Sequence, residues 1–179
     1  MSDKPVIFIS HSSKDKELAL VLQEQIANVI GVAKSNVFLS TDSGAIPASS
    51  DWFGEIKKNL DGADALVILF TPSSTESSWV NFEIGYFWHK TRGKYIYPVT
   101  TPNVQVEGKG PVERLQAKSL GEVSQIEAFF EALINQHGGE LTKLDTNAIK
   151  EVVEPKPSFA KVQVTGLYGN TPKRTRPRS

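Results

Sequence analysis

Four short segments of this sequence are apolar at nearly every position, without the alternation of polar and apolar residues that marks a half-exposed strand. They are rich in Val, Ile, Leu, Phe and Tyr, and they cover residues 6–10, 37–40, 63–70 and 95–99. Strands that are apolar on both sides belong in a parallel sheet whose two faces are covered by helices. This pattern therefore favours a buried parallel sheet over an antiparallel sheet with one solvent-exposed face.

Segments with helical periodicity lie between these strands. Their apolar residues recur every three or four positions: Leu18, Leu22, Ile26 and Val29, then Trp52, Ile56 and Leu60, then Trp79, Phe82, Tyr86 and Phe87. A weaker strand is expected within residues 114–120, followed by an amphipathic helix that ends at Gly138 and Gly139. Alternating strands and helices form right-handed crossovers. We therefore expect an α/β fold, a flavodoxin-like doubly wound parallel sheet of about five strands with helices on both faces.

The chain is expected to divide after residue 139. With 179 residues in all, residues 1–139 can form one ordinary domain with a core of its own. Residues 140–179 are then a C-terminal extension, with a short helix possible within 142–153 before Pro155 and Pro157. Residues 161–179 carry five basic and no acidic side chains. Such a tail can contact phosphates or can simply be a solvated terminus.

Composition excludes several classes of function. The absence of cysteine excludes disulfides and thiolate metal sites, and three scattered histidines give no metal-binding pair. Twenty basic and twenty acidic residues leave no net charge to attract nucleic acid or an anionic membrane. No signal-peptide core is visible, and no run approaches the roughly 20 apolar residues of a membrane span. We expect a cytoplasmic protein that binds a small molecule or another protein.

The turn after the first strand is a candidate binding site. Ser10, His11, Ser12 and Ser13 lead directly into the first helix. Small hydroxyl side chains and free backbone N–H groups at a helix N-terminus bind phosphate well. The alternative is that Ser13 or Asp15 only caps the helix. The sequence contains neither a glycine-rich dinucleotide fingerprint nor a P-loop.

The connection after the second strand is unusually long. It begins at Ser40, Thr41 and Asp42 and continues through residues 43–50, beyond the usual length of about 2 to 6 residues. Ile46 stands beside the rigid Pro47, and an exposed apolar side chain of this kind is typical of a protein contact. The alternative is a mobile surface loop.

Trp79 and Glu83 are four residues apart, so a helix places the indole and the carboxylate on the same face. An aromatic plane beside an acid suits a base linked to a sugar. The preceding strand ends at the sheet edge where doubly wound proteins bind their ligands. The alternative is a core tryptophan with an exposed glutamate. Phe82, Tyr86 and Phe87 can fill the core without Trp79, which favours the site.

In order, these features resemble a Toll/interleukin-1 receptor (TIR) domain of the bacterial type. The resemblance covers about residues 5–137 and rests on residues 6–12, residues 37–40, the loop with Ile46 and Pro47, and Trp79-x-x-x-Glu83. TIR domains are either scaffolds that self-associate or enzymes that cleave NAD⁺ at the nicotinamide–ribose bond, and the glutamate on the third helix separates the two groups.

Residue by residue, the resemblance implies that Glu83 is the catalytic glutamate and Trp79 its aromatic partner. It places Ser12 and Ser13 in the nucleotide-contacting turn and Asp42 at the acidic position after the second strand. Some animal members carry arginines where Ser12 and Ser13 stand, so phosphate binding here is expected to depend more on backbone N–H groups.

The function implied is an NAD⁺ nucleosidase that produces ADP-ribose or a cyclic ADP-ribose isomer, with NAD⁺ as substrate and no cofactor. The resemblance also implies activation by self-assembly, in which the loop with Ile46 and Pro47 docks on a neighbouring TIR domain, and a role in bacterial immunity against phage. Two alternatives stay open: a non-catalytic TIR adaptor that acts by TIR–TIR contacts or mimics host TIR domains, and a nucleoside deoxyribosyltransferase of similar topology.

Overall fold

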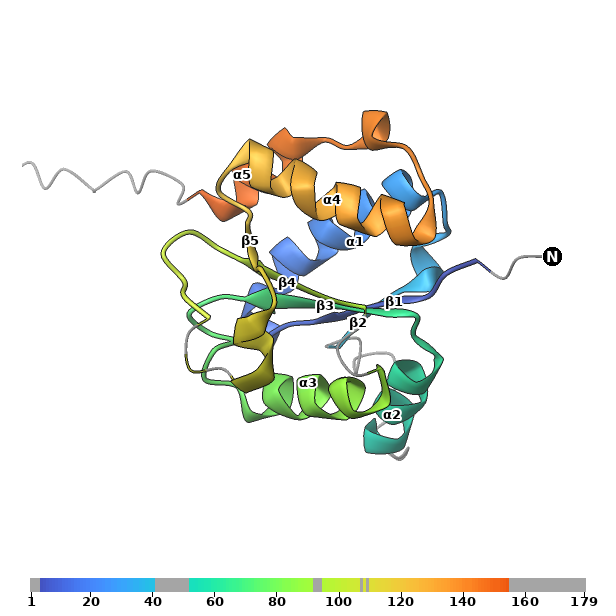
Figure 1. Ribbon diagram of the computed structural model, residues 1–179, viewed down its shortest axis with the longest axis vertical. Coiled ribbons are helices and arrows are strands. Elements are labelled where there is room, and N and C mark those ends of the chain that lie inside the picture. Colours follow the sequence, from blue (N-terminus) through green and yellow to red (C-terminus); the bar gives the residue numbers. More distant parts are fainter. Residues whose placement is uncertain (1–3, 41–51, 92–94, 107, 109, 155–179) are drawn as a thin grey trace, which may run out of the picture.

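A parallel sheet of five strands forms the centre of the protein (Figure 1). The computed structural model describes residues 4–40, 52–91, 95–106, 108 and 110–154. All four strand pairings are parallel, and the spatial order is β2-β1-β3-β4-β5. The strands are β1 (Ile7–Ser10), β2 (Val37–Leu39), β3 (Ala65–Phe70), β4 (Ile96–Thr100) and β5 (Lys118–Ser119). This flavodoxin-like order confirms the predicted fold class.

Helices cover both faces of the sheet. One face carries α1 (Lys16–Ile30), α4 (Val123–His137) and α5 (Thr146–Val153), and the other carries α2 (Trp52–Gly62) and α3 (Ser78–Thr91). The chain moves from β1 to β2 in one direction along the sheet and from β3 to β4 in the other. Right-handed crossovers therefore place α1 and α3 on opposite faces. Short 3₁₀ turns complete the connections: η1 (Ser13–Asp15), η2 (Lys34–Asn36), η4 (Gly110–Arg114) and η5 (Leu141–Lys143).

The C-terminal extension contributes α5 to the α1 side of the sheet. This helix begins at Thr146 because the Asp145 side chain caps it, accepting hydrogen bonds from the N–H groups of Asn147 and Ala148. Ile149 is fully buried in the same core as α1 and α4. The helix predicted within residues 142–153 is thus present, while the domain boundary at residue 139 stays a prediction. Within the described part of the chain, no helix combines the length and apolarity of a membrane span.

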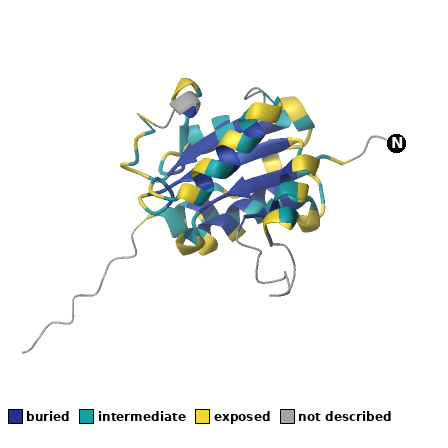
Figure 2. Ribbon diagram, turned by 90° about the horizontal axis from the view of Figure 1, so that it is seen from below, coloured by how far each residue is buried: buried dark blue, intermediate teal, exposed yellow. Residues whose placement is uncertain are grey.

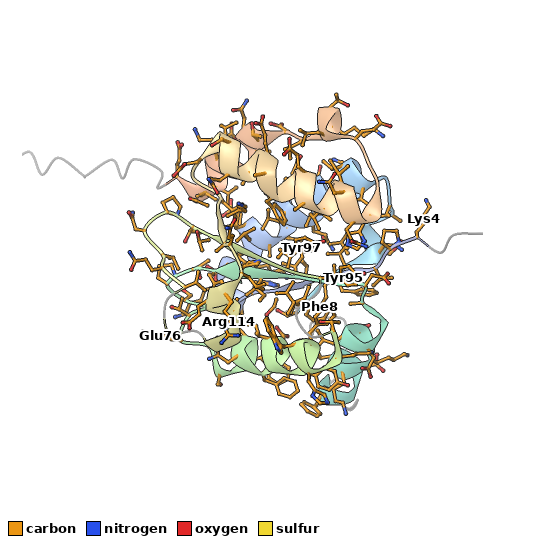
Figure 3. All side chains as sticks on the ribbon, in the orientation of Figure 1. Lys4, Phe8, Glu76, Tyr95, Tyr97 and Arg114 are labelled. Carbon is orange, nitrogen blue, oxygen red and sulfur yellow. The ribbon has the colours of Figure 1, made fainter. Side chains whose placement is uncertain are left out.

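Two apolar cores lie on either side of the sheet. Alternate residues of β1 face opposite cores: Ile7 and Ile9 contribute to the core with α1, α4 and α5, and Phe8 to the core with α2 and α3. Figure 3 shows Phe8 and Tyr97 on opposite sides of the sheet. Figure 2 shows buried strands between helices whose outer sides are exposed. By the same alternation, Ser10 faces the α3 side.

The inward face of α3 differs from the prediction. Its buried residues are Val80, Glu83, Ile84 and Phe87. Trp79, Phe82 and Tyr86 are only partly buried. Tyr86 packs against the core that contains Phe87, as does Trp79, whereas Phe82 is not part of that core, so the expectation that Phe82 fills the core is wrong. Both sets have helical spacing and form neighbouring stripes on the same helix, and the stripe from Val80 to Phe87 is the one that packs on the sheet.

Candidate active site

Glu83 is a buried carboxyl group attached to the end of β1 by a hydrogen bond. The residue is 0% exposed. Ser10, the last residue of β1 and also 0% exposed, donates from Oγ to Oε2 of Glu83. The second carboxyl oxygen, Oε1, is buried and accepts no hydrogen bond of ordinary geometry from the described residues. One oxygen is therefore held by the end of the sheet, and the Trp79 side chain is the second polar group that acts on the carboxyl group.

Burial raises the pKa of Glu83 from 4.5 to about 8. Loss of hydration disfavours the charged form of a carboxyl group. Hydrogen bonding from Ser10, and next from Trp79, lowers the pKa but does not offset the effect of burial. A carboxyl group with so perturbed a pKa at the ligand-binding edge of a doubly wound sheet is a candidate for chemistry.

Trp79 lies one helical turn before Glu83, and the four-residue spacing places both side chains on the same face of α3. Hydrogen bonding from the Trp79 side chain lowers the pKa of the Glu83 carboxyl group. The indole is half-buried, with its ring centroid 5.3 Å from that of Phe82 and 6.2 Å from that of Phe53 on α2. The alternative of a core tryptophan with an exposed glutamate is wrong, because the glutamate is the buried member of the pair.

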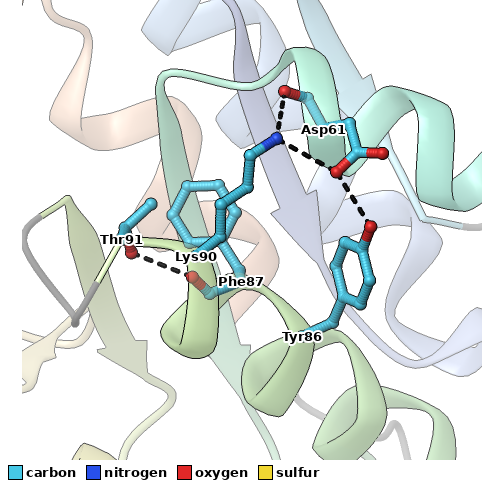
Figure 4. A network of polar contacts seen from close by, with 5 residues as sticks. All are labelled: Asp61, Tyr86, Phe87, Lys90 and Thr91. Carbon is cyan, nitrogen blue, oxygen red and sulfur yellow. Dashed lines mark hydrogen bonds and ion pairs between the residues drawn. The ribbon is translucent and has the colours of Figure 1, made fainter.

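A polar network fixes the second half of α3 to the end of α2 (Figure 4). The Tyr86 hydroxyl and Lys90 Nζ donate to Oδ1 of Asp61 at 2.8 and 3.0 Å, and Lys90 also donates to the Asp61 carbonyl at 2.6 Å. The hydrogen bond from Lys90, followed by that from Tyr86, lowers the pKa of Asp61. The network is exposed, so it orients the two helices more than it stabilises the fold.

His11 forms part of a buried link between β1 and β2. It is 1% exposed, and its backbone N–H donates to Ser40 Oγ at 3.1 Å. Its ring Nδ1 lies 3.2 Å from both Ser40 Oγ and the carbonyl oxygen of Ile9. The histidine is thus held within the strand ends, and its predicted contact with substrate stays a prediction.

The other predicted contacts lie further out or outside the described residues. Ser12 Oγ accepts a hydrogen bond from the N–H of Lys14 at 3.4 Å and so caps η1, and Ser13 is exposed. Their roles in substrate binding, like that of Ser10, stay predictions. The positions Asp42, Ile46 and Pro47 lie outside the described residues.

The turn after β1 is tied to the turn after β3 by a pair that the sequence analysis missed. Asp15 makes no side-chain cap on α1, and its Oδ2 instead accepts a hydrogen bond from Thr71 Oγ1 at 2.7 Å. The alternative that Ser13 or Asp15 only caps this helix is therefore wrong, because Asp15 stands at the N-cap position without a side-chain hydrogen bond to the helix. The partners are 56 residues apart, and no local pattern indicates a pairing at that separation.

A cavity of about 430 Å³ opens beside this link. Its walls come from the start of α1, the turns after β3 and β4, and the last residues of α5, including Asp15, Thr71 and Val153. Glu83 does not line it. The cavity therefore lies apart from the buried carboxyl group.

Comparison with protein families agrees with the geometry. A family model of the TIR domain matches residues 7–134. A comparison with curated proteins finds no significant match. The matched range starts at the first residue of β1 and ends within α4, so it contains the complete sheet and the pair formed by Ser10 and Glu83. With its parallel sheet of five strands, this chain belongs to the TIR domain family.

Proposed function

We propose that this TIR domain cleaves NAD⁺ at the nicotinamide–ribose bond and releases ADP-ribose or a cyclic ADP-ribose isomer. The observation that supports the proposal most is the buried Glu83 carboxyl group, held at the carboxyl edge of the sheet with Trp79 one turn away. A carboxyl group without a paired cation is costly to bury. Such a cost is commonly retained where the group takes part in chemistry.

The reaction requires little more than one well-placed anion. The bond between C1′ of the ribose and the pyridinium nitrogen breaks, and its electron pair neutralises the departing nicotinamide, so no general acid is required. Positive charge then develops on the sugar, as in glycoside hydrolysis. The ionised Glu83 carboxylate stabilises that charge, and a fixed anion in a dry site is most effective in the transition state. Water attacks C1′ and loses a proton, or a nitrogen of the same nucleotide closes the ring.

The raised pKa of Glu83 is consistent with this role. In the free protein burial favours the neutral acid at pH 7. A cationic nicotinamide riboside beside the carboxyl group favours the ionised form, because an opposite charge within about 4–6 Å lowers the pKa of an acid. We infer that substrate binding and ionisation of Glu83 support each other.

Incubation of NAD⁺ with concentrated protein tests the proposal. We expect chromatography to show loss of NAD⁺ and equal release of nicotinamide, and the remaining product to identify hydrolysis or cyclisation. A deoxynucleoside assayed in parallel should stay intact, which separates this activity from that of a deoxyribosyltransferase. If NAD⁺ remains intact at every protein concentration, the domain is not an NAD⁺ nucleosidase.

The second candidate function is a non-catalytic adaptor that acts through TIR–TIR contacts. A partly exposed aromatic cluster of Phe53, Trp79, Phe82 and Tyr86 on α2 and α3 favours a protein contact on this side of the domain. The most exposed member of this cluster is Phe53, which is 43% exposed. Self-association is common to TIR domains and compatible with both functions, and the NAD⁺ assay separates them. By family resemblance we propose that either function serves bacterial immunity in the cytoplasm.

Substitution of Trp79 should separate its structural and substrate-binding roles. Trp79→Ala removes a half-buried ring from the aromatic cluster, so we expect a loss of up to about 3 kcal/mol in the free energy of unfolding and weaker NAD⁺ binding. Trp79→Phe keeps a ring but removes the N–H group beside Glu83. Its melting temperature should stay close to that of the wild type while KM for NAD⁺ rises. An unchanged KM in Trp79→Phe would show that the indole only packs.

We also expect activity to depend on assembly. The loop with Ile46 and Pro47 is proposed to dock on a neighbouring TIR domain and complete its pocket, so specific activity should rise with protein concentration. Ile46→Asp places a charge at that contact, and an unpaired buried charge is costly. This variant should stay monomeric in analytical ultracentrifugation and turn over slowly. Constant activity per molecule down to a demonstrated monomer would contradict the dependence on assembly.

A further inference from the structure

The contact between Ser10 and Glu83 follows from the geometry of β1. Ser10 is the last residue of the β1 ladder and pairs with Ile68 of β3. Its side chain points to the same side as Phe8, which belongs to the core beneath α3. Both Ser10 and Glu83 are fully buried where they meet. The hydroxyl is therefore held by an interior strand of the sheet.

We propose that Ser10 is a positioning residue: its hydroxyl holds Oε2 of Glu83 at the end of β1 and leaves Oε1 as the oxygen that meets the ribose of the substrate. The inference rests on the proposed NAD⁺ cleavage. It differs from the expectation that Ser10 contacts the nucleotide itself, because the Ser10 O–H group donates to Glu83. Ser10 acts on the reaction only through the carboxyl group that it holds.

The physical role of this contact is preorganisation. A glutamate side chain has three rotatable torsions, and a carboxylate that must stabilise developing charge is most effective when its position is fixed beforehand. The hydroxyl also favours the charged form of Glu83, opposing the effect of burial. Removing the donor leaves a buried acceptor without its hydrogen bond, which disfavours the carboxylate still further.

Among the described residues, no charged side chain shifts the pKa of Glu83, and Ser10 and Trp79 are the polar side chains that do. β1 and β3, which pack on α3, carry no charged residue. On α2, Lys57 lies over the rings of Phe53 and Tyr86, and Asp61 is bound to Lys90. The other charged groups on α2, α3 and η4 are exposed: Glu55, Lys58, His89, Glu113 and Arg114. None of these is a cause of the shifted pKa of Glu83.

A series of variants at Ser10 tests the inference. Ser10→Ala removes the donor, and Ser10→Cys keeps nearly the same size with a weaker donor. The control is Ser40→Ala, which removes a buried serine hydroxyl at the end of the adjacent β2 that is bonded to His11 instead. The Glu83 carboxyl is titrated by carbon NMR, with its signal assigned by its absence in Glu83→Gln. The pH profile of kcat/KM for NAD⁺ is measured in parallel.

In Ser10→Ala we expect the Glu83 titration midpoint to rise by about one pH unit. The reason is that the lost hydrogen bond stabilises the ionised carboxylate. At pH 7, kcat/KM should fall at least tenfold, because that shift lowers the ionised fraction about tenfold. It should recover only in part at higher pH, because the ionised carboxylate is no longer held in place. Ser10→Cys should lie between Ser10→Ala and the wild type. Ser40→Ala should leave the midpoint unchanged.

An unchanged midpoint in Ser10→Ala would overturn the inference, and so would a kcat/KM equal to that of the wild type at every pH, which would mean that the hydroxyl does not hold the carboxyl group. If the wild type does not cleave NAD⁺, the proposed function fails and the assignment of Oε1 to the ribose fails with it. The NMR midpoints still decide, in that case, whether Ser10 holds the Glu83 carboxyl group. The two failures are therefore distinguishable.

Discussion

Glu83→Gln is expected to lower kcat for NAD⁺ cleavage at least a hundredfold while the protein stays folded. The change keeps the size and helix propensity of the side chain and removes the negative charge. Loss of one preorganised electrostatic contact with the transition state typically costs roughly 3 kcal/mol. Because glutamine still carries an oxygen that can accept the hydrogen bond from Ser10, the effect isolates the charge. Initial rates followed by chromatography at saturating NAD⁺ measure it.

Two further variants make the result specific. Glu76→Gln removes an exposed glutamate near the start of α3 and should leave the rate close to that of the wild type. Glu83→Asp keeps the charge but withdraws it from Ser10 by one methylene, so its activity should lie between those of the wild type and Glu83→Gln. Full turnover by Glu83→Gln would show that the carboxylate is not catalytic.

Glu83→Gln is also expected to have a higher free energy of unfolding than the wild type, and this difference should grow as the pH rises. The pKa of Glu83 is about 8 in the folded protein and 4.5 as its ordinary value. Between these values the folded state binds the proton that the unfolded state releases. The contribution of Glu83 to the free energy of unfolding is fully present below pH 4.5 and is lost as the pH rises through about 8.

The difference in the free energy of unfolding between Glu83→Gln and the wild type should therefore grow by up to about 5 kcal/mol from acid to alkaline pH. Urea unfolding of both proteins at pH 5, 7 and 9 measures this difference, and the titration of all other groups cancels in it. Glu76→Gln should show no comparable growth. A difference that stays constant with pH would mean that Glu83 is not buried as a neutral acid. This test is independent of any enzymatic activity.

Local spacing in the sequence was sufficient to predict the sheet and one candidate pair of site residues. Strands such as residues 65–70, apolar at every position, are typical of a parallel sheet covered on both faces. The adjacency of Trp79 and Glu83 follows from the pitch of a helix, whatever the helix packs against. These features depend on neighbours within a few residues, and the sequence records such neighbours directly.

The tertiary structure decided which face of α3 is buried and what Glu83 contacts. Two adjacent stripes on that helix are both apolar enough to pack, and only the shape of the sheet surface selects the one that contains Glu83. Ser10 and Glu83 are 73 residues apart, and Asp15 and Thr71 are 56 apart. Such pairs meet because the strand order brings the ends of β1 and β3 together. Burial of the carboxyl group, and with it the pKa of Glu83, is set by that packing because the loss of hydration depends on every element that covers the group.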